Sequence, residues 1–375
     1  MFEFLNTWLT NGGFWVAIPL IIIGCAALIK GADWLVEGAS GLAKQYGISD
    51  IVIGLTVVAF GTSMPEFVVN MVAVGQGNTE IAITNVLGSN IINTFVILGM
   101  TALIYPISSQ KQSRRFDIPW SALGAVLILM FAIYSSPSWL DIDGWVNVQI
   151  NNPSFRDLGS LDWGAGSMSF ISRIGGIILW IFFIFYLWQT FKTAKASDSD
   201  ESYTPVPTWK ALLLIIGGLL GLVIGGEVIV KSATSIAQSL GVSDAIIGLT
   251  VVALGTSLPE LATSCMAAMK KNCDIALGNV VGSNIFNIFF ILGTSACVMP
   301  LPGYQGLETD AIMAAVGSAL VLGFVYLNKK REIRRWHGAL LLLCYAGYLT
   351  YRILTLYPLN SSEAITKHYT TCTSY

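Results

Sequence analysis

The segment GLTVVAFGTSMPE at Gly54–Glu66 recurs as GLTVVALGTSLPE at Gly248–Glu260, with eleven of thirteen positions unchanged. Both copies lie inside long apolar runs, and both end in a carboxylate. A charged side chain at the centre of a bilayer costs at least roughly 2.5 kcal/mol, so it usually faces a partner, a cavity or an ion. Two carboxylates in the same setting therefore predict one shared site.

The chain around these segments has the composition of a polytopic membrane protein. Of its 375 residues, 54% are hydrophobic and 11% are charged, and the mean hydropathy is +0.68, which excludes an ordinary soluble domain. A membrane crossing needs roughly 17 to 25 mostly apolar residues. Ten stretches are long enough, at 14–36, 50–74, 80–105, 118–136, 168–191, 209–232, 244–268, 274–299, 310–327 and 336–357. The expected fold is an all-α polytopic membrane protein with ten transmembrane helices.

Basic residues occur in alternate connections between these spans, and cytoplasmic connections are the ones enriched in Lys and Arg. Fourteen of the twenty basic residues fall in the connections that would face inward: Lys44, Lys111, Arg114, Arg115, Lys192, Lys195, Lys210, Lys270, Lys271, Lys329, Lys330, Arg331, Arg334 and Arg335. Acidic residues mark the outward connections, at Asp141, Asp143, Asp157, Asp162, Glu308 and Asp310. Both termini are therefore expected outside the cytoplasm, in a plasma membrane or a bacterial inner membrane. The first residues lack the basic region of a secretory signal, so we expect the first apolar run to be a retained span.

The two segments belong to an internal duplication. Moving the chain by 194 residues aligns 31–99 with 225–293 without a gap, and GSNIINTFVILG at Gly88–Gly99 recurs as GSNIFNIFFILG at Gly282–Gly293. Each copy has five expected spans, an odd number, so the second copy would enter the membrane from the opposite face. We expect two inverted five-helix repeats, at 1–192 and 209–357, joined by a short cytoplasmic linker at 193–208 and followed by a polar tail at 358–375. Inverted repeats with interrupted helices are typical of secondary transporters.

The sequence also predicts where two helices are interrupted. Gly61 and Pro65 fall in the second span, and Gly255 and Pro259 fall in the seventh. Proline removes a backbone donor and clashes with the preceding turn of a helix. The carbonyls that it frees are tolerated at membrane depth only inside protein or along a wet cavity, where they can bind a cation.

Hydroxyl and carboxylate oxygens gather at both interruptions. Thr62, Ser63 and Glu66 lie within about one helical turn, and Thr256, Ser257 and Glu260 repeat the set. Neither set contains a thiolate or an imidazole. Such ligands suit hard cations, and Ca²⁺ takes roughly 6 to 8 oxygens.

A second polar layer is expected from the third and eighth spans. Ser89 and Asn93 are four residues apart and share one helix face, and Ser283 and Asn287 repeat the arrangement. Small hydroxyl residues are also ordinary packing residues between membrane helices, so Ser89 and Ser283 fit either role. Two further amides lie on a different face and would cap a helix or bond across helices, at Asn90 and Asn284.

For Glu66 and Glu260 the alternative is a structural ion pair, whose expected partners would be Lys30 in the first span and Lys231 in the sixth. Three other acids read as cavity-lining or helix-end residues: Asp33, Glu37 and Glu227. Asp50 and Asp244 each lie at the start of a span, where an acid is expected at a helix N-terminus. The six scattered cysteines are expected to pack as small apolar residues, and both histidines to lie at the surface, at His337 and His368.

Together the motifs GTSMPE with GSNIIN and GTSLPE with GSNIFN resemble those of the sodium/calcium exchanger family. The resemblance covers two alpha-repeats, at about 47–99 and 241–293, and implies ten transmembrane helices. The second, third, seventh and eighth would form the ion-binding core, and the first and sixth would slide as a gate. It further implies a Ca²⁺ site made by the Glu66 and Glu260 side chains with the carbonyls of Thr62 and Thr256. The Na⁺ sites would add Ala59, Ser63, Ser89, Ala253, Ser257 and Ser283, with Asn93 and Asn287 facing a central position.

Two features distinguish this chain within the resemblance. Asn287 stands where potassium-dependent relatives have Asp, so the pattern is the potassium-independent one and the cavity has two carboxylates. One Ca²⁺ would neutralise them, whereas three Na⁺ would leave one positive charge and make exchange electrogenic. The connection after the fifth span, at 191–209, is too short for the Ca²⁺-sensing domain of animal relatives.

The sequence therefore predicts a secondary antiporter that exchanges Na⁺ for Ca²⁺ by alternating access in the lipid bilayer. The alternative on the same scaffold is exchange of Ca²⁺ or another cation for protons, against which the extra hydroxyls of Ser63 and Ser257 argue. An ion channel and a non-transporting scaffold are further alternatives. We expect no enzyme activity, no cofactor and no nucleic-acid partner, and a monomer would suffice for transport.

Overall fold

The computed structural model describes residues 3–135, 169–193, 206–240, 253–304 and 306–356. Several predictions from the sequence lie outside these residues: the acids of the connection 137–167, most of the linker, the start of the seventh span, and the C-terminal tail. The individual residues concerned are Lys195, Asp244, His368 and Cys372.

The described chain is built of helices, several of which contain π-helical turns, here labelled η. In chain order they are α1 (Glu3–Tyr46), α2 (Asp50–Ile53), η1 (Gly54–Val58), α3 (Ala59–Thr62), α4 (Met64–Gly75), α5 (Thr79–Ile92), η2 (Asn93–Ile97), α6 (Leu98–Ile104), η3 (Ser113–Asp117), α7 (Ile118–Ser135), α10 (Arg173–Lys192), α11 (Thr208–Ser239), α13 (Ala253–Gly255), α14 (Leu258–Met269), α15 (Cys273–Ile285), η6 (Phe286–Leu292), α16 (Gly293–Val298), α17 (Leu307–Leu327) and α18 (Arg335–Leu356).

Among the described residues, eight helices are long and apolar enough to cross a membrane, and a bent pair, Asp50–Thr62 with Met64–Gly75, makes a ninth. These nine coincide with nine of the ten expected spans. The remaining expected span, 244–268, is described only from α13 onward. The chain is therefore a polytopic helical membrane protein.

The first and sixth spans are longer than predicted. We expected them to end at residues 36 and 232, whereas α1 continues to Tyr46 and α11 to Ser239. The acids near these expected ends lie within the helices, so the helix-end interpretation of them is wrong. Asp33 pairs with Lys30 at 2.7 Å and with Lys270 at 2.5 Å, while Glu227 pairs with Lys231 at 3.2 Å. Paired charges do not force a helix to end.

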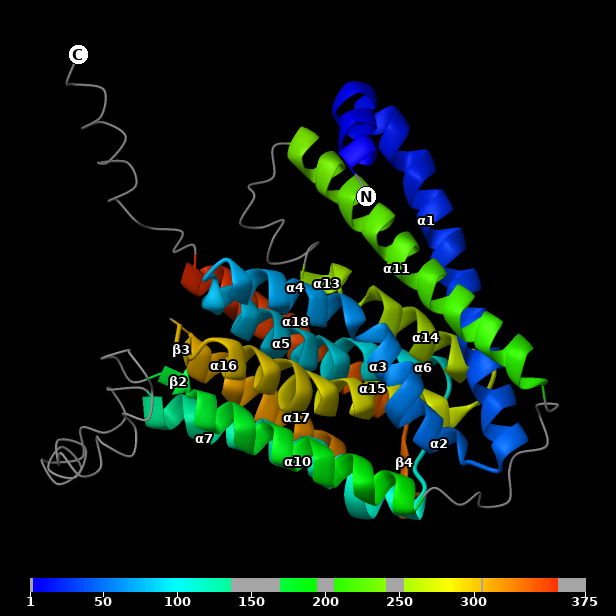
Figure 1. Ribbon diagram of the computed structural model, residues 1–375, viewed down its shortest axis with the longest axis vertical. Helices are drawn as coiled ribbons and strands as arrows, with labels where there is room; N and C mark the ends of the chain where they lie inside the picture. The colour runs from blue at the N-terminus through cyan, green and yellow to red at the C-terminus, as the bar shows by residue number, and fades with distance from the viewer. Residues whose placement is uncertain (1–2, 136–168, 194–205, 241–252, 305, 357–375) are drawn as a thin grey trace, which may run out of the picture.

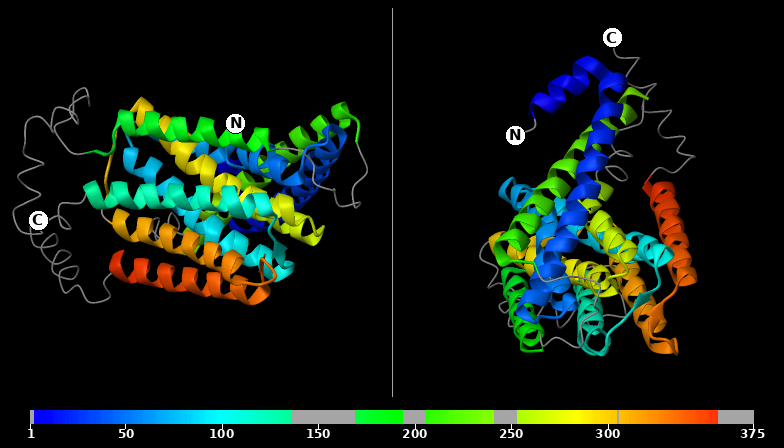
Figure 2. Two further views of the ribbon diagram at one scale, coloured as in Figure 1. Left: turned by 90° about the horizontal axis from the view of Figure 1, so that it is seen from below. Right: turned by 90° about the vertical axis from the view of Figure 1, so that its right-hand side faces the viewer.

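Helices α1 and α11 lie side by side and project from the rest of the bundle (Figures 1 and 2). Glycines let their backbones touch. A Cβ atom added to Gly31 would lie 2.7 Å from the Gly218 carbonyl oxygen, and one added to Gly225 would lie 2.7 Å from that of Gly24. Gly24 and Gly31 precede Gly218 and Gly225 by the repeat offset of 194 residues. This contact between α1 and α11, here called the seam, is thus antiparallel. It contains two glycine–glycine approaches, Gly31 with Gly218 and Gly24 with Gly225, that are related by the repeat.

Two short antiparallel strand pairs lie at opposite ends of the bundle (Figure 1). The strand β1 (Ile107–Ser108) pairs with β4 (Glu332–Ile333), and β2 (Ser169–Ile171) pairs with β3 (Leu301–Pro302). In register, Ile107 faces Ile333 and Leu301 faces Ile171. Ile107 and Leu301 are 194 residues apart, and Ile171 and Ile333 are 162 apart. Each pair therefore links the two parts of the chain, and 162 is the offset that relates α10 to α18.

The centre of the bundle is formed by the third and eighth spans. In the most apolar window of Cys273–Val298, 94% of residues are buried, against 11% for Arg335–Thr355. Gly278 and Gly282 of α15 lie against the second span, where an added Cβ would be 3.0 Å from the Ile51 carbonyl and 2.9 Å from the Leu55 Cα atom. This close approach brings the second and eighth spans together at the broken helix. The membrane-facing helices α10, α11 and α18 lie outside this core.

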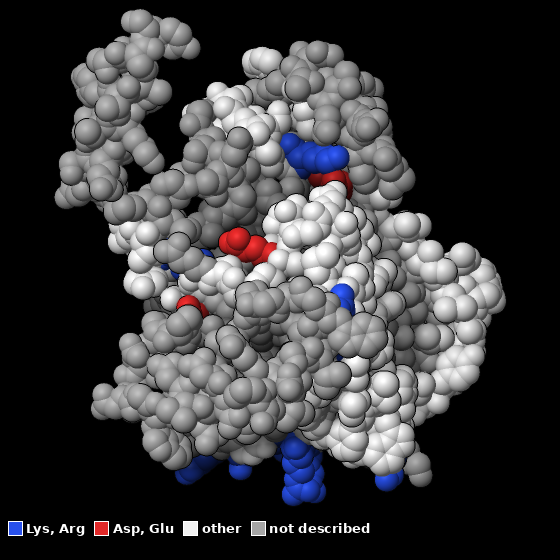
Figure 3. Space-filling model, turned by 60° about the vertical axis from the view of Figure 1, so that its left-hand side comes forward, with Lys and Arg blue, Asp and Glu red and all other residues white. Residues whose placement is uncertain are grey.

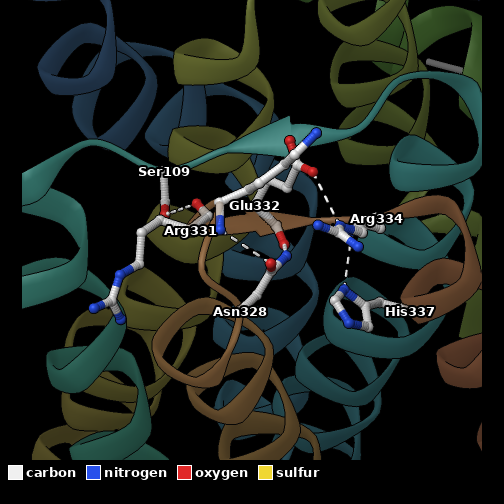
Figure 4. Close-up of polar contacts among 7 residues, drawn as sticks. Ser109, Asn328, Arg331, Glu332, Arg334 and His337 are labelled. Carbon is white, nitrogen blue, oxygen red and sulfur yellow. Dashed lines mark hydrogen bonds and ion pairs between the residues drawn. The ribbon is translucent and has the colours of Figure 1, made fainter.

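The turn between α17 and α18 carries a cluster of basic residues, and Figure 3 shows basic side chains projecting from one end of the molecule. His337, predicted to lie at the surface, is buried. Its Nδ1 accepts a hydrogen bond from the backbone N–H of Arg334 at 2.9 Å (Figure 4), and its ring stacks on Phe324 with 4.1 Å between centroids. The prediction was wrong because the imidazole caps a helix start and packs on an aromatic ring. The five described cysteines are free.

Candidate functional site

The second and seventh spans are broken at equivalent serines. Ser63 separates α3 from α4 with φ −83° and ψ 6°, and Ser257 precedes α14 with φ −90° and ψ 5°. The two parts of the second span are inclined by 45°. Pro65 and Pro259 follow in the first helical turn. A proline N–H is missing there, so the carbonyls of Gly61 and Gly255, four residues earlier, lose their helical donor.

Gly61 and Gly255 also have no room for a side chain. A Cβ atom on Gly61 would lie 2.5 Å from a methyl group of Leu219, and one on Gly255 would lie 2.3 Å from a methyl group of Val230. Both of these neighbours are on α11. The broken helices are thus held tightly against α11.

The carboxylates of Glu66 and Glu260 lie at the breaks and are fully buried. Each is bonded by the serine of the other copy. Ser63 Oγ donates to Glu260 Oε1 at 2.9 Å, and Ser257 Oγ donates to Glu66 Oε1 at 3.3 Å. The two repeated segments therefore meet in one site, as their sequence predicts.

The third and eighth spans contribute the second polar layer. Ser89 Oγ donates to Glu66 Oε1 at 3.3 Å, and Ser283 Oγ donates to Glu260 Oε1 at 3.4 Å. The serines are thus in direct contact with the acids and not only packing residues. Asn287 joins the same layer, because its Nδ2 donates to Ser89 Oγ at 3.0 Å.

Backbone support for both acids comes from asparagines that the sequence analysis did not single out. Asn85 Nδ2 donates to the Glu66 carbonyl and Asn279 Nδ2 to the Glu260 carbonyl, both at 3.2 Å. Asn85 Nδ2 also donates to Asn70 Oδ1 at 2.7 Å, and Asn279 Nδ2 to Ser264 Oγ at 2.8 Å. Asn85 and Asn279 are 194 residues apart in apolar helices, a signal that could have identified them.

The remaining predicted ligands are placed less uniformly. Thr62 is buried and donates to Asn279 Oδ1 at 3.1 Å, whereas Thr256 is only half-buried. Ala59 is buried against Gly282, and the side chain of Ala253 lies outside the described residues. The two other amides bond across helices, as one of the expectations had it: Asn90 donates to the Asn284 carbonyl at 3.3 Å, and Asn284 donates to Thr94 Oγ1 at 2.9 Å.

Several buried polar atoms of the site have no hydrogen-bond partner among the described residues. Glu66 Oε2, Glu260 Oε2, Asn287 Oδ1 and both polar atoms of Asn93 have no hydrogen-bond partner. Asn93 begins the π-helical turn η2, and Asn287 lies in η6. Such turns insert one extra residue into a helix and are frequent at functional sites. The open atoms belong to equivalent positions of the two copies.

No basic side chain among the described residues forms an ion pair with Glu66 or Glu260. Lys30 and Lys231, the proposed partners in the structural alternative, pair with Asp33 and Glu227 instead. The site therefore combines two carboxylates with hydroxyl, amide and carbonyl oxygens. Ligands of this kind bind hard cations.

A polytopic helical bundle with buried, oxygen-lined acids at two broken helices defines a membrane transporter of ions. The family model described as "Sodium/calcium exchanger protein" matches residues 16–192 and 210–354, so the chain belongs to the sodium/calcium exchanger family. Its relatives are transporters and not enzymes, as expected.

Individual relatives agree with this membership. The sodium/calcium exchanger MaX1 of Methanosarcina acetivorans is 33% identical over 88% of this chain and 96% of its own length. The inner membrane protein YrbG of Escherichia coli is 32% identical over 76% of this chain and 81% of its own. A solved structure of the sodium-calcium exchanger NCX_Mj is 31% identical, with a TM-score of 0.72 over 90% of this chain and 99% of that chain.

Proposed function

We propose that the protein is a secondary antiporter that exchanges Na⁺ for Ca²⁺ by alternating access. The observation that supports this most directly is the crossed pair of bonds from Ser63 to Glu260 and from Ser257 to Glu66, with Oε2 of each acid left open. The same oxygens serve either ion, so binding of one excludes the other. That competition is the coupling.

In this proposal Ca²⁺ is bound by the Glu66 and Glu260 side chains with the carbonyls of Thr62 and Thr256. Na⁺ ions use the same acids together with hydroxyl and carbonyl oxygens from the two copies, at Ala59, Ser63, Ser89, Ala253, Ser257 and Ser283. Asn93 and Asn287 face the position between them. The buried contacts of Ser63, Ser89, Ser257 and Ser283 to the acids support this assignment.

The charge of the site favours electrogenic exchange. Two carboxylates are neutralised by one Ca²⁺, whereas three Na⁺ leave one net positive charge. Asn93 and Asn287 add no further charge, which also fits transport without K⁺.

Alternating access in this proposal is a movement of α1 and α11 across the core. The halves 1–192 and 209–357 are inverted copies, so the two end states mirror one another. Strand and glycine contacts that recur at the 194-residue offset support the duplication. The distribution of basic residues favours both termini outside the cytoplasm, with the protein in a plasma or bacterial inner membrane.

The test is uptake of radiolabelled Ca²⁺ into proteoliposomes loaded with Na⁺. Wild-type protein should accumulate Ca²⁺ when Na⁺ leaves and should not do so when a pH gradient replaces the Na⁺ gradient. Glu66→Gln and Glu260→Gln should each abolish uptake, whereas Glu80→Gln, which changes an exposed acid in the first turn of α5, should retain it. Normal uptake by either of the first two variants would exclude the two-carboxylate site. Uptake driven by protons alone would favour the cation/proton alternative.

A further inference from the structure

A second buried carboxylate lies outside the central site, in the fourth span. Asp117 ends the π-helical turn η3 and is 1% exposed. Tyr186 of α10 is fully buried next to it, and the rings of Phe116 and Trp120, which flank Asp117, lie 5.7 Å and 6.3 Å from the Tyr186 ring between centroids. Asp117 and Tyr186 are close enough to interact electrostatically.

The polar atoms around Asp117 are buried and have only one another as neighbours for weak polar contacts. Both carboxylate oxygens, Ser113 Oγ, Tyr186 OH, Thr190 Oγ1 and the neighbouring Trp120 Nε1 are buried without a well-formed hydrogen bond, although Ser113 interacts with Asp117 and Thr190 with Tyr186. Ser113 lies one turn before Asp117, and Thr190 lies one turn after Tyr186 on α10. A buried polar group without a partner is costly, and a buried charge more so. The cluster therefore presents unused oxygens from two helices to one place.

Basic residues lie close in sequence, but they are engaged elsewhere. Arg114 donates to the Ser109 carbonyl. Arg115 is exposed, and the Lys192 ammonium lies over the Trp188 ring at 4.8 Å. Within the described part of the chain, no ion pair involves Asp117.

The second half of the chain contains the equivalent cluster in a completed form. Asp310 stands at the start of α17, 193 residues after Asp117, and Tyr348 of α18 follows Tyr186 by the 162-residue offset of the strand pairs. Tyr348 OH donates to Asp310 Oδ1 at 2.8 Å, and Tyr304 OH donates to Oδ2 at 2.5 Å. In both halves an Asp at the start of one helix lies near a Tyr of the next long helix, although the two Asp positions are 193 and not 194 residues apart and Tyr304 has no tyrosine counterpart.

The two clusters differ in one charge. Arg352 is 3.5 Å from Asp310 Oδ1 and forms an ion pair with it, with both side chains largely buried. The position equivalent to Arg352 at the 162-residue offset is Thr190. The first cluster therefore has the acid, the tyrosine and an additional hydroxyl, but it lacks the cation that completes the second.

We propose that Asp117, Ser113, Tyr186 and Thr190 form a second cation site, in which a monovalent hard cation such as Na⁺ takes the place of the Arg352 guanidinium. All the available ligands are oxygens, which suits a hard cation, and the single carboxylate balances one positive charge. The bound ion joins α7 to α10, so it stabilises the fourth and fifth spans and is not transported. This site is independent of the proposed exchange reaction.

The test uses full-length protein with the central acids neutralised, Glu66→Gln/Glu260→Gln. Thermal unfolding in detergent is compared in NaCl and in N-methylglucamine chloride. Na⁺ should raise the Tm by a few degrees, because a ligand that binds only the folded state stabilises it. Adding Asp117→Asn should remove the Na⁺ response. Adding Thr190→Arg should also remove it, with the Tm already high without Na⁺, whereas Phe191→Arg, an exposed neighbour, should leave the response intact.

A Tm that does not respond to Na⁺ in the Glu66→Gln/Glu260→Gln protein, or a response that survives Asp117→Asn, would overturn the proposal and leave Asp117 neutral or hydrated. A second measurement does not require these variants to fold. Wild-type crystals in which Tl⁺ replaces Na⁺ should give an anomalous peak beside Asp117, separate from any peak between Glu66 and Glu260. The absence of that peak would equally refute the site.

Discussion

Replacing Arg352 by Met should strongly destabilise the packing of α17 on α18. Arg352 and Asp310 form an ion pair at 3.5 Å with side-chain exposures of 13% and 8%. Removing one partner of a buried pair costs about 3 to 5 kcal/mol, because it leaves an uncompensated charge. Tyr304 and Tyr348 still donate to the carboxylate, so we expect a loss near the lower end. A loss of about 3 kcal/mol lowers the folding equilibrium constant by a factor on the order of 100.

The assay is a double-mutant cycle on detergent-solubilised protein, with unfolding followed by tryptophan fluorescence. Arg352→Met should lose about 3 kcal/mol, and Asp310→Asn/Arg352→Met should recover most of it because no charge remains buried. A loss below about 1 kcal/mol for Arg352→Met would refute the reasoning, since that is the range of an exposed ion pair. A double variant as unstable as the single one would show that the arginine acts through packing and not through charge.

Two further predictions concern transport. Acid should inhibit Na⁺-driven uptake of radiolabelled Ca²⁺, because burial and mutual repulsion favour the neutral forms of Glu66 and Glu260 when no ion is bound; activity that stays flat into acid would contradict proton competition. Gly218→Ala should slow exchange, because its Cβ would lie 2.7 Å from the Gly31 carbonyl at the seam of α1 and α11, whereas Gly217→Ala, whose Cβ would come no closer than 3.6 Å to Trp34, should exchange normally. Equal rates for the two alanine variants would exclude the seam as a determinant of the movement.

The sequence was a good guide wherever it repeats itself. The duplicated motif located the breaks at Ser63 and Ser257, because a Gly and a Pro at fixed spacing act on the backbone locally. The motif also predicted that Glu66 and Glu260 share one site, because buried charges in equivalent spans need a common environment. Helical spacing placed Ser89 and Ser283 on shared faces with Asn93 and Asn287 but left open whether the serines pack or bind; the structure brings each within hydrogen-bonding distance of an acid.

Pairings between distant segments could not be read in the same way. Asp33 lies inside α1, where it pairs with Lys270 at the C-terminal end of α14, a residue remote in sequence. Burial of His337 depends on the ring of Phe324. Asp310 was assigned to an outward connection, but it is 6% exposed because two tyrosines and an arginine converge on it. For each of these residues the residue type favours exposure to solvent, whereas a partner that is remote in sequence allows the side chain to be wholly or partly buried.

The crossed bonds from each serine to the acid of the other copy make the central site a property of the junction between two chain segments and not of either segment. A movement that separates the breaks withdraws a hydrogen bond from both carboxylates in the same step. Neither carboxylate can then lose its serine donor while the other carboxylate keeps all of its hydrogen-bond donors. In the proposed exchange cycle the two halves of the site would therefore fill and empty together, and we expect a disruption of one break to weaken the other as well.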